Sequence, residues 1–195
     1  MNKFQIGLFL GLLLVVSCQK ENAVKQVDDV CSVMDDIVFI QYCYDRFDAN
    51  HDGKVSMEEA GYVHEIRVPY YHIYSLKGIE YFTQLKFLEC TAIDIKSIDL
   101  SKNKELVELI CTSCNLENLD LSHNLKLKSL NCADNRLSFL DVSKNTQLLS
   151  ISCRYNKLTS IDVSKNTQLG YLICNPQYDD NGQYYNITPV GWKED

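Results

Sequence analysis

The chain has 195 residues and a formal net charge of −7 at pH 7. This length accommodates one domain or two small ones, and hydrophobic residues at 46% supply enough apolar material for a core. Binding to nucleic acid requires a concentrated basic face, and the sequence contains no basic cluster of that kind. The composition therefore argues against a nucleic-acid partner.

Residues 1–17 have the pattern of a secretory signal peptide. Lys3 supplies a positive charge, an apolar stretch runs from Ile6 to Val16, and small residues precede Cys18. The apolar stretch is too short for a transmembrane helix. The segment resembles a bacterial lipoprotein signal, which implies cleavage before Cys18, acylation of Cys18 and a membrane-anchored lipoprotein of the outer membrane or cell surface. The alternative is an ordinary signal peptide with an incidental cysteine.

Residues 18–28 are polar and predict a tether, and residues 29–68 predict a small helical unit. Apolar residues recur at helical spacing along Ile37, Ile40, Cys43, Tyr44 and Phe47, so a helix is expected from about residue 29 to residue 47. A second helix is expected to begin near residue 60 and to include Ile66. We expect this unit to cover the open end of the repeats that follow, because solenoids require capped ends.

Between these helices, residues 48–59 carry oxygen-bearing side chains at regular spacing around Gly53. Calcium takes six to eight oxygen ligands, and a glycine at the sixth position permits the sharp turn of a binding loop. The segment resembles an EF-hand calcium loop, although the sequence shows one such loop where EF-hands usually come in pairs. The resemblance implies Ca²⁺ ligation by the side chains of Asp48, Asn50, Asp52 and Glu59, the carbonyl of Lys54, and Ser56 directly or through water.

Residues 69–176 are dominated by a 21-residue repeat. Two columns recur in register, namely Cys90, Cys111, Cys132, Cys153 and Cys174, and Asn103, Asn124, Asn145 and Asn166. Self-similarity at this period is typical of a solenoid. The unit L-x-x-L-x-C-x-x-N-x-L resembles a bacterial leucine-rich repeat, and residues 76–85 resemble the entry unit of internalin-type repeats. The resemblance implies an α/β-type solenoid, mostly β, with short parallel strands on its concave side and the helical EF-hand unit as its N-terminal cap.

The cysteines and the repeated aspartates are expected to be structural. The cysteines at period 21 occupy core positions, whereas Cys31 and Cys43 can pair only if the helix breaks between them. Asp99, Asp120, Asp141 and Asp162 are expected to bind turn amides, with a second cation ladder as the alternative. Residues 177–195 are expected to fold back as a C-terminal cap around the turn-forming residues 180–182.

The positions that vary between repeats are the candidates for partner binding, because they line the strands while the scaffold stays constant. Aromatic, apolar and arginine side chains at such positions are typical of protein interfaces. The candidates are Phe87, Glu108, Ile110, Arg154, Tyr155 and Tyr171. A glycan partner is the alternative, and it would stack on Tyr155, Tyr171 and Trp192.

The sequence lacks the nucleophile, nucleotide-binding and metalloprotease motifs that mark common enzyme classes. The predicted function is therefore a non-enzymatic, calcium-binding surface or periplasm-facing lipoprotein that binds another macromolecule, most simply a protein, through its repeats. A calcium-dependent hydrolase is a further and less favoured alternative.

Overall fold

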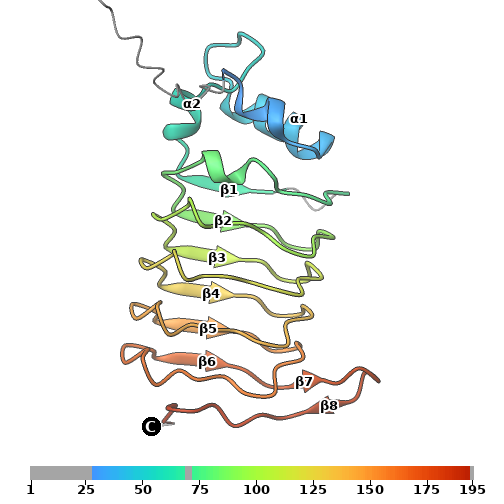
Figure 1. Ribbon diagram of the computed structural model, residues 1–195, viewed down its shortest axis with the longest axis vertical. Helices are drawn as coiled ribbons and strands as arrows, with labels where there is room; N and C mark the ends of the chain where they lie inside the picture. The colour runs from blue at the N-terminus through green and yellow to red at the C-terminus, as the bar shows by residue number, and fades with distance from the viewer. Residues whose placement is uncertain (1–27, 69–71, 194–195) are drawn as a thin grey trace, which may run out of the picture.

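The computed structural model describes residues 28–68 and 72–193. The helices lie at one end of a stack of parallel strands, and an antiparallel hairpin lies at the other (Figure 1). The predicted signal peptide, Cys18 and all but the last residue of the predicted tether lie outside the described residues. The helical elements are η1 (Val30–Val33), α1 (Ile37–Phe47), α2 (Met57–Gly61) and η2 (Ile79–Tyr81).

The helical cap differs from the prediction at two places. The predicted continuous helix over residues 29–47 is wrong, because η1 ends at Val33 and α1 starts separately at Asp36. The Asp36 side chain caps α1 by accepting hydrogen bonds from the N–H groups of Val38 and Phe39, both at 3.0 Å. The second carboxylate oxygen of Asp36 accepts the N–H of Tyr74 at 2.7 Å, which ties this break to the solenoid. The predicted exit helix ends at Gly61, and Ile66 lies in a strand.

Six strands form one parallel sheet in chain order, and from β2 onward each is offset from its neighbour by one repeat. They are β1 (Glu65–Arg67), β2 (Phe87–Glu89), β3 (Glu108–Ile110), β4 (Ser129–Asn131), β5 (Ser150–Ser152) and β6 (Tyr171–Ile173). The predicted parallel strands are confirmed from β2 onward. The sheet begins earlier than residue 69, because β1 lies within the segment that the sequence assigned to the helical unit and pairs with β2.

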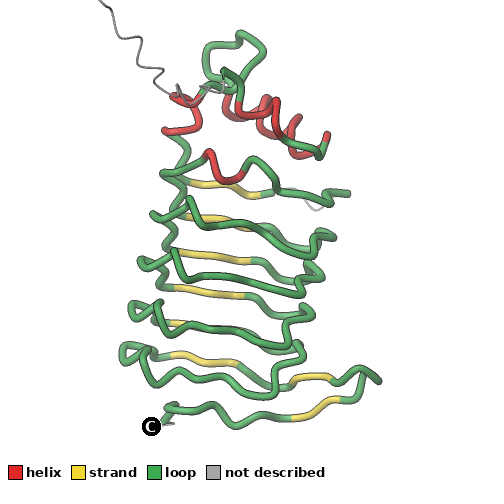
Figure 2. The backbone as a smooth tube through the Cα atoms, viewed as in Figure 1, coloured by secondary structure: helices red, strands yellow, loops and turns green. Residues whose placement is uncertain are grey.

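From β2 to β6, each repeat returns from one strand to the next through loops (Figure 2), since 21 residues leave no room for a full helix. The amide of Asn124 bridges adjacent repeats by donating to the carbonyl oxygens of Leu100 at 3.1 Å and Asn103 at 2.9 Å. Asn145 and Asn166 repeat this pattern. One hydrophobic cluster extends from Val30 in the cap to Ile187 in the tail, so the cap and the repeats share a core.

The C-terminal residues fold back on the last repeat, as predicted. Strands β7 (Gln177–Tyr178) and β8 (Tyr184–Tyr185) form an antiparallel hairpin. Beyond it, the N–H of Val163 donates to the carbonyl of Val190 at 2.9 Å, and the N–H of Val190 donates to Ile161 at 2.8 Å. The tail thus adds one more rung to the returning side of the solenoid. Within the described residues, none of the helices has the length and apolar character needed to span a membrane.

Candidate functional site

Residues 48–59 form a loop between α1 and α2 in which the predicted ligand side chains point inward. Asp48 accepts hydrogen bonds from the N–H groups of Asp52 at 3.1 Å and Gly53 at 2.9 Å. Asn50 accepts from Asp52 at 2.9 Å, and Asp52 accepts from Lys54 at 3.0 Å. Gly53 has a φ of 82°, a conformation that side-chain-bearing residues rarely adopt. The chain therefore makes the sharp turn that the loop pattern requires.

Glu59 closes this loop from its far end. One carboxylate oxygen accepts the N–H of Ala49 at 2.9 Å, and the other accepts the N–H and hydroxyl of Ser56 at 2.9 and 2.8 Å. Ser56 in turn caps α2 by accepting the N–H of Glu59. These hydrogen bonds from Ser56 lower the pKa of the Glu59 carboxyl, so this ligand candidate is ionised at neutral pH.

The six predicted calcium ligands thus lie in one loop and the first turn of α2. Among the described residues, no group of three or more His, Cys, Asp or Glu side chains is arranged so that it could hold a metal ion. The predicted set also relies on an amide, a hydroxyl and a backbone carbonyl, and its carboxylates accept loop N–H groups in this structure. Calcium binding by Asp48, Asn50, Asp52, Lys54, Ser56 and Glu59 remains a prediction.

The outward-facing residues of the strands form two continuous columns, which together we call the strand face. The pairing places one residue of each repeat directly beside its counterpart in the next. The first column is Glu65, Phe87, Glu108, Ser129, Ser150 and Tyr171, and the second is Arg67, Glu89, Ile110, Asn131, Ser152 and Ile173. Phe87, Glu108, Ile110 and Tyr171 therefore lie on one surface, as the repeat register predicts.

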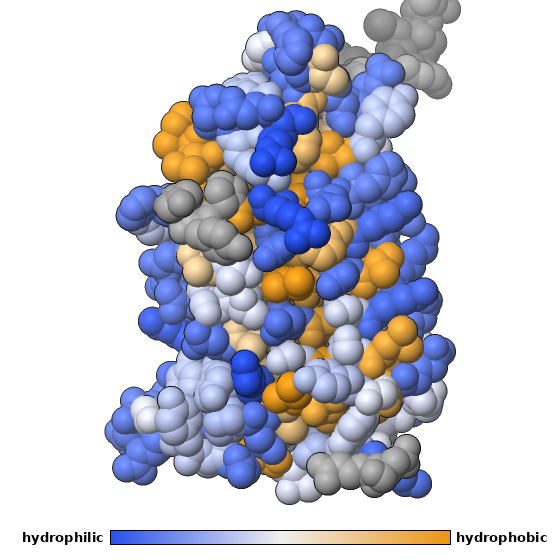
Figure 3. All heavy atoms as spheres, turned by 180° about the vertical axis from the view of Figure 1, so that it is seen from behind, coloured by the Kyte–Doolittle hydropathy of each residue, from blue (hydrophilic) through white to orange (hydrophobic). Residues whose placement is uncertain are grey.

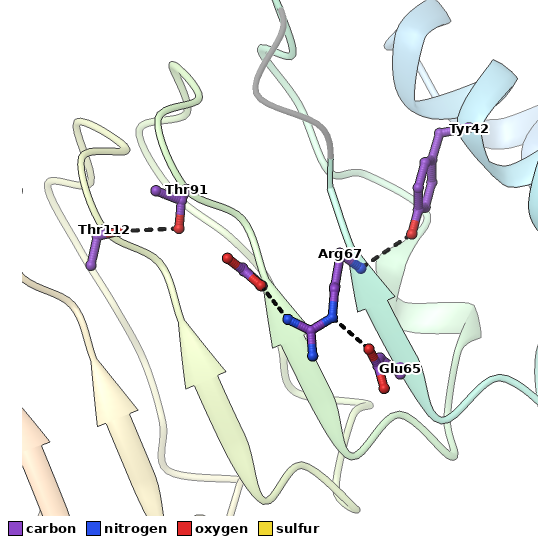
Figure 4. Close-up of polar contacts among 6 residues, drawn as sticks. Tyr42, Glu65, Arg67, Thr91 and Thr112 are labelled. Carbon is purple, nitrogen blue, oxygen red and sulfur yellow. Dashed lines mark hydrogen bonds and ion pairs between the residues drawn. The ribbon is translucent and has the colours of Figure 1, made fainter.

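Arg67 organises the end of the strand face nearest the cap (Figure 4). Its guanidinium forms ion pairs with Glu65 at 2.5 Å and Glu89 at 2.7 Å, and it lies over the ring of Phe87 at 4.2 Å from the centroid. Its backbone N–H donates to the hydroxyl of Tyr42 in α1 at 3.1 Å. The cap and the strand face therefore meet at Arg67.

A second cluster lies where the loop directly after β5 approaches the C-terminal hairpin. The guanidinium of Arg154 lies 5.2 Å from the ring centroid of Tyr155, and Tyr155 makes an edge contact with Tyr184 at 5.9 Å between centroids. Tyr184 is 70% exposed. The structure thus brings two of the predicted partner residues, Arg154 and Tyr155, together with an aromatic residue of the tail.

The repeated aspartates bind turn amides, which is the expected structural role. In each turn the carboxylate accepts the N–H of the serine two residues later at 2.8–2.9 Å. The same bonds lower the pKa values of these carboxyls. The cysteines of the repeats are buried, as predicted.

Two functional or structural residues escaped the sequence analysis. Arg67 lies outside the 21-residue register, because it precedes its neighbour Glu89 by 22 residues. The salt bridge between these two side chains, across β1 and β2, could not be read from the repeat pattern. Gln177 continues the column of buried side-chain amides formed by Asn135 and Asn156, at the same spacing of 21 residues. Its side-chain oxygen accepts the N–H groups of Asn156 at 3.2 Å and Leu158 at 3.1 Å. The period of 21 could have identified Gln177.

Comparison with solved structures gives three informative similarities. The functional domain of InlJ from Listeria monocytogenes, described as including a cysteine ladder, shares 35% sequence identity over 75% of this chain, with a TM-score of 0.67. An internalin (inlF) from the same species shares 16% identity over 76% of this chain, with a TM-score of 0.58. The ectodomain of the plant receptor kinase GASSHO1/SCHENGEN3 from Arabidopsis thaliana shares 16% identity over 64%, with a TM-score of 0.52.

This chain spans 33%, 58% and 17% of those three structures, respectively. No protein-family model and no curated protein matches the sequence. The two likenesses at 16% identity concern the fold alone, whereas the InlJ domain is also similar in sequence. The described residues form a parallel-strand β-solenoid whose structural neighbours are internalin-type leucine-rich-repeat proteins.

Proposed function

We propose that this chain is a protein-binding leucine-rich-repeat module that receives its partner on the strand face and binds Ca²⁺ in its cap. The observation that carries the proposal is the register of the strands. Leucine or isoleucine stands at the centre of each strand and is buried in β1 to β5, while the two flanking columns change chemistry from repeat to repeat. A constant core below a varied surface is suited to specific recognition.

The chemistry of the strand face supports a protein partner. Phe87 and Arg67 offer an aromatic ring under a guanidinium, Ile110 adds a half-buried apolar contact, and polar residues lie beyond them. Aromatic and arginine side chains dominate the binding energy of protein interfaces. The plant receptor ectodomain with a similar fold was solved in complex with CASPARIAN STRIP INTEGRITY FACTOR 2, which is a precedent for partner binding by such a solenoid.

The surface seen from behind is mixed in character, with apolar residues as separate spots among hydrophilic ones (Figure 3). Phe139 is one exposed apolar residue of the returning segments, with 73% of its surface accessible. It lies outside both columns of the strand face, so it provides a control position for binding experiments.

Calcium binding by residues 48–59 is supported by the inward-pointing oxygens of Asp48, Asn50 and Asp52, by the turn at Gly53 and by the ionised Glu59. Calcium would stabilise the folded cap, because a ligand that binds only the folded state shifts the unfolding equilibrium. Because the cap shares its core with the repeats, that stabilisation would extend to the first strands.

Anchoring through an acylated Cys18 completes the proposal and rests on the sequence of residues 1–18. Two or three acyl chains at one site give stable attachment to a membrane, whereas one chain gives reversible attachment. A polar tether would then hold the cap and the strand face away from the lipid. Metabolic labelling with a fatty-acid analogue tests the anchor, since Cys18→Ser should abolish incorporation.

The binding proposal is tested by affinity capture with the soluble chain from Gln19. The double variants Arg67→Ala/Phe87→Ala and Arg154→Ala/Tyr155→Ala should each weaken binding of the captured protein by at least about tenfold, as expected for interface anchors. The control Phe139→Ala should bind like the parent chain. Equal binding by the parent chain and the Arg67→Ala/Phe87→Ala variant would contradict recognition by the strand face.

A glycan partner is the second candidate, and the cluster of Arg154, Tyr155 and Tyr184 favours it because aromatic rings provide stacking surfaces. Screening the same chain on immobilised glycans separates the two candidates. Glycan retention that Tyr184→Ala abolishes, together with no captured protein, would replace the protein partner with a glycan.

A further inference from the structure

The cap contains two cysteines that the repeats do not explain. Cys31 lies in η1 and Cys43 lies in α1, and their exposed fractions are 2% and 0%. Neither residue belongs to the 21-residue column of cysteines, which begins at Cys90. Both are thiols in this structure.

The break between η1 and α1 brings these two thiols together. On one continuous helix, 12 residues would separate them by about 18 Å, beyond the reach of a disulfide. In the structure the chain leaves the helical conformation at residues 34–36, and η1 packs against α1. Both thiols are buried at this contact, and the Cys31 thiol is the main cause of the raised pKa of Cys43. The helix break that the sequence leaves open is therefore present.

Neighbouring contacts hold the same two backbone segments in place. Asp29, two residues before Cys31, accepts the hydroxyl of Tyr44 at 2.7 Å, and Tyr44 follows Cys43 directly. The same carboxylate accepts the N–H of Cys31 at 3.0 Å. The pair is thus positioned by hydrogen bonds on either side, and not by thiol packing alone.

We propose that Cys31 and Cys43 form a disulfide that fastens η1 to α1. Two thiols lose two protons and two electrons, one S–S bond forms, and a disulfide oxidant accepts the electrons and protons as its own S–S bond is reduced to two thiols. Reaction proceeds through a thiolate that attacks the oxidant and a mixed disulfide that the second thiol resolves. An exported protein encounters such oxidants.

Burial explains when the bond forms and why it persists. Hydrogen bonding to Cys31 and desolvation raise the pKa of the Cys43 thiol, so the folded cap disfavours the thiolate needed for exchange. The bond therefore forms while the cap is still folding. Once the cap has closed, the same burial keeps reductants away from the disulfide.

The experiment maps the cysteines of the full chain after refolding with oxidised glutathione. Alkylation in denaturant without reductant, followed by trypsin, gives one peptide over residues 26–46, because neither Lys nor Arg occurs between Gln26 and Asp45. This peptide should be unalkylated and lighter by two hydrogens. Cleavage after Met34 should leave its halves joined until reductant is added. Alkylation of both thiols, or linkage of either to another cysteine, would overturn the proposal.

A thermal measurement on the same protein gives an independent test. Reduction in denaturant followed by refolding with a strong reductant should lower the unfolding midpoint of the parent chain by on the order of 5 °C. The Cys31→Ala/Cys43→Ala variant should show no such difference between oxidising and reducing conditions. A midpoint shift of equal size in that variant would assign the effect to other cysteines.

Discussion

The backbone N–H of Val30 donates a hydrogen bond to the carbonyl oxygen of Val55 at 2.8 Å. Val55 is the eighth residue of the predicted calcium loop, the position through which EF-hand loops usually pair with a second loop. The N–H of Val55 donates to the side chain of Asp29 at 3.1 Å, so both backbone groups of Val55 are satisfied by residues 29–30. The segment before α1 thus packs along this loop at Val55.

Asp29 joins three parts of the cap, so we expect Asp29→Ala to destabilise it by about 2–4 kcal/mol. The substitution leaves the N–H groups of Cys31 and Val55 and the hydroxyl of Tyr44 without this acceptor. Urea unfolding measures the change. Asp28→Ala removes the same charge from the exposed neighbouring position and should cost less than about 0.5 kcal/mol. Similar losses in both variants would contradict this role for Asp29.

Calcium should raise the unfolding midpoint of the parent chain relative to chelator. The expected gain is about 1.4 kcal/mol for each tenfold excess of Ca²⁺ over the dissociation constant. Glu59→Gln should lose this gain, whereas Glu58→Gln should retain it, because Glu58 is exposed and is not a predicted ligand. Differential scanning calorimetry provides the measurement. An unfolding midpoint of the parent chain that is the same with calcium and with chelator would refute the calcium site.

The regular part of the fold could be predicted because one residue pattern recurs without insertions. The columns of Cys90 to Cys174 and Asn103 to Asn166 set the register, and parallel pairing then follows at each rung. The strand-face residues Phe87, Glu108, Ile110 and Tyr171 were consequently placed correctly relative to one another. Periodicity carries this information because every repeat makes the same contacts with its neighbours.

The cap could be predicted only in part because its contacts occur once. The stripe from Ile37 to Phe47 indicates a helix, but the capping bonds of Asp36 that define its start also depend on Tyr74, 38 residues away. Arg67 shows no repeat pattern, so its place beside Glu89 follows from the pairing of β1 with β2. Such tertiary contacts override helical periodicity and leave no local signal.

The two columns of buried amides should differ in their contribution to stability. Asn135 donates to the carbonyl of Cys111 at 2.7 Å and accepts the N–H groups of Cys114 and Leu116 at 3.1 and 2.9 Å. The side chain of Asn145 makes only donor contacts, because its buried oxygen has no hydrogen-bond partner among the described residues.

We therefore expect Asn135→Ala to cost about 3–5 kcal/mol and Asn145→Ala about 1–2 kcal/mol, since buried N–H groups left without acceptors carry the larger penalty. Urea unfolding of both variants tests the difference. A larger loss of stability for Asn145→Ala than for Asn135→Ala would contradict this difference between the two columns.

The turn aspartates should make the solenoid less stable in acid. Hydrogen bonds from the following serines hold the pKa values of Asp120 and Asp141 below the ordinary 3.8, so the unfolded chain takes up protons first as the pH falls. Their stabilisation is present above the unfolded pKa and is lost as the pH falls through the folded one. Asp120→Asn/Asp141→Asn should flatten the loss of stability below about pH 4. An unchanged acid limb of the stability curve would contradict this account.

Gly191 allows the tail to pack against the last repeat, so Gly191→Ala should detach it. An added Cβ would lie 2.5 Å from the Cα and 2.7 Å from the backbone nitrogen of Ser164, and the φ of 79° already disfavours alanine. Gly182 in the hairpin turn has a similar φ of 76° but nothing within 4 Å of its Cβ position. Gly182→Ala therefore reports conformational strain alone, about 1 kcal/mol, whereas Gly191→Ala adds a clash with backbone atoms and should cost about 3 kcal/mol or more.

Hydrogen exchange at Val163 and Val190, whose N–H groups bond the tail to the repeat, should accelerate in Gly191→Ala and stay near the parent rate in Gly182→Ala. Equal protection of both amides in the two variants would show that the close approach at Ser164 does not hold the tail.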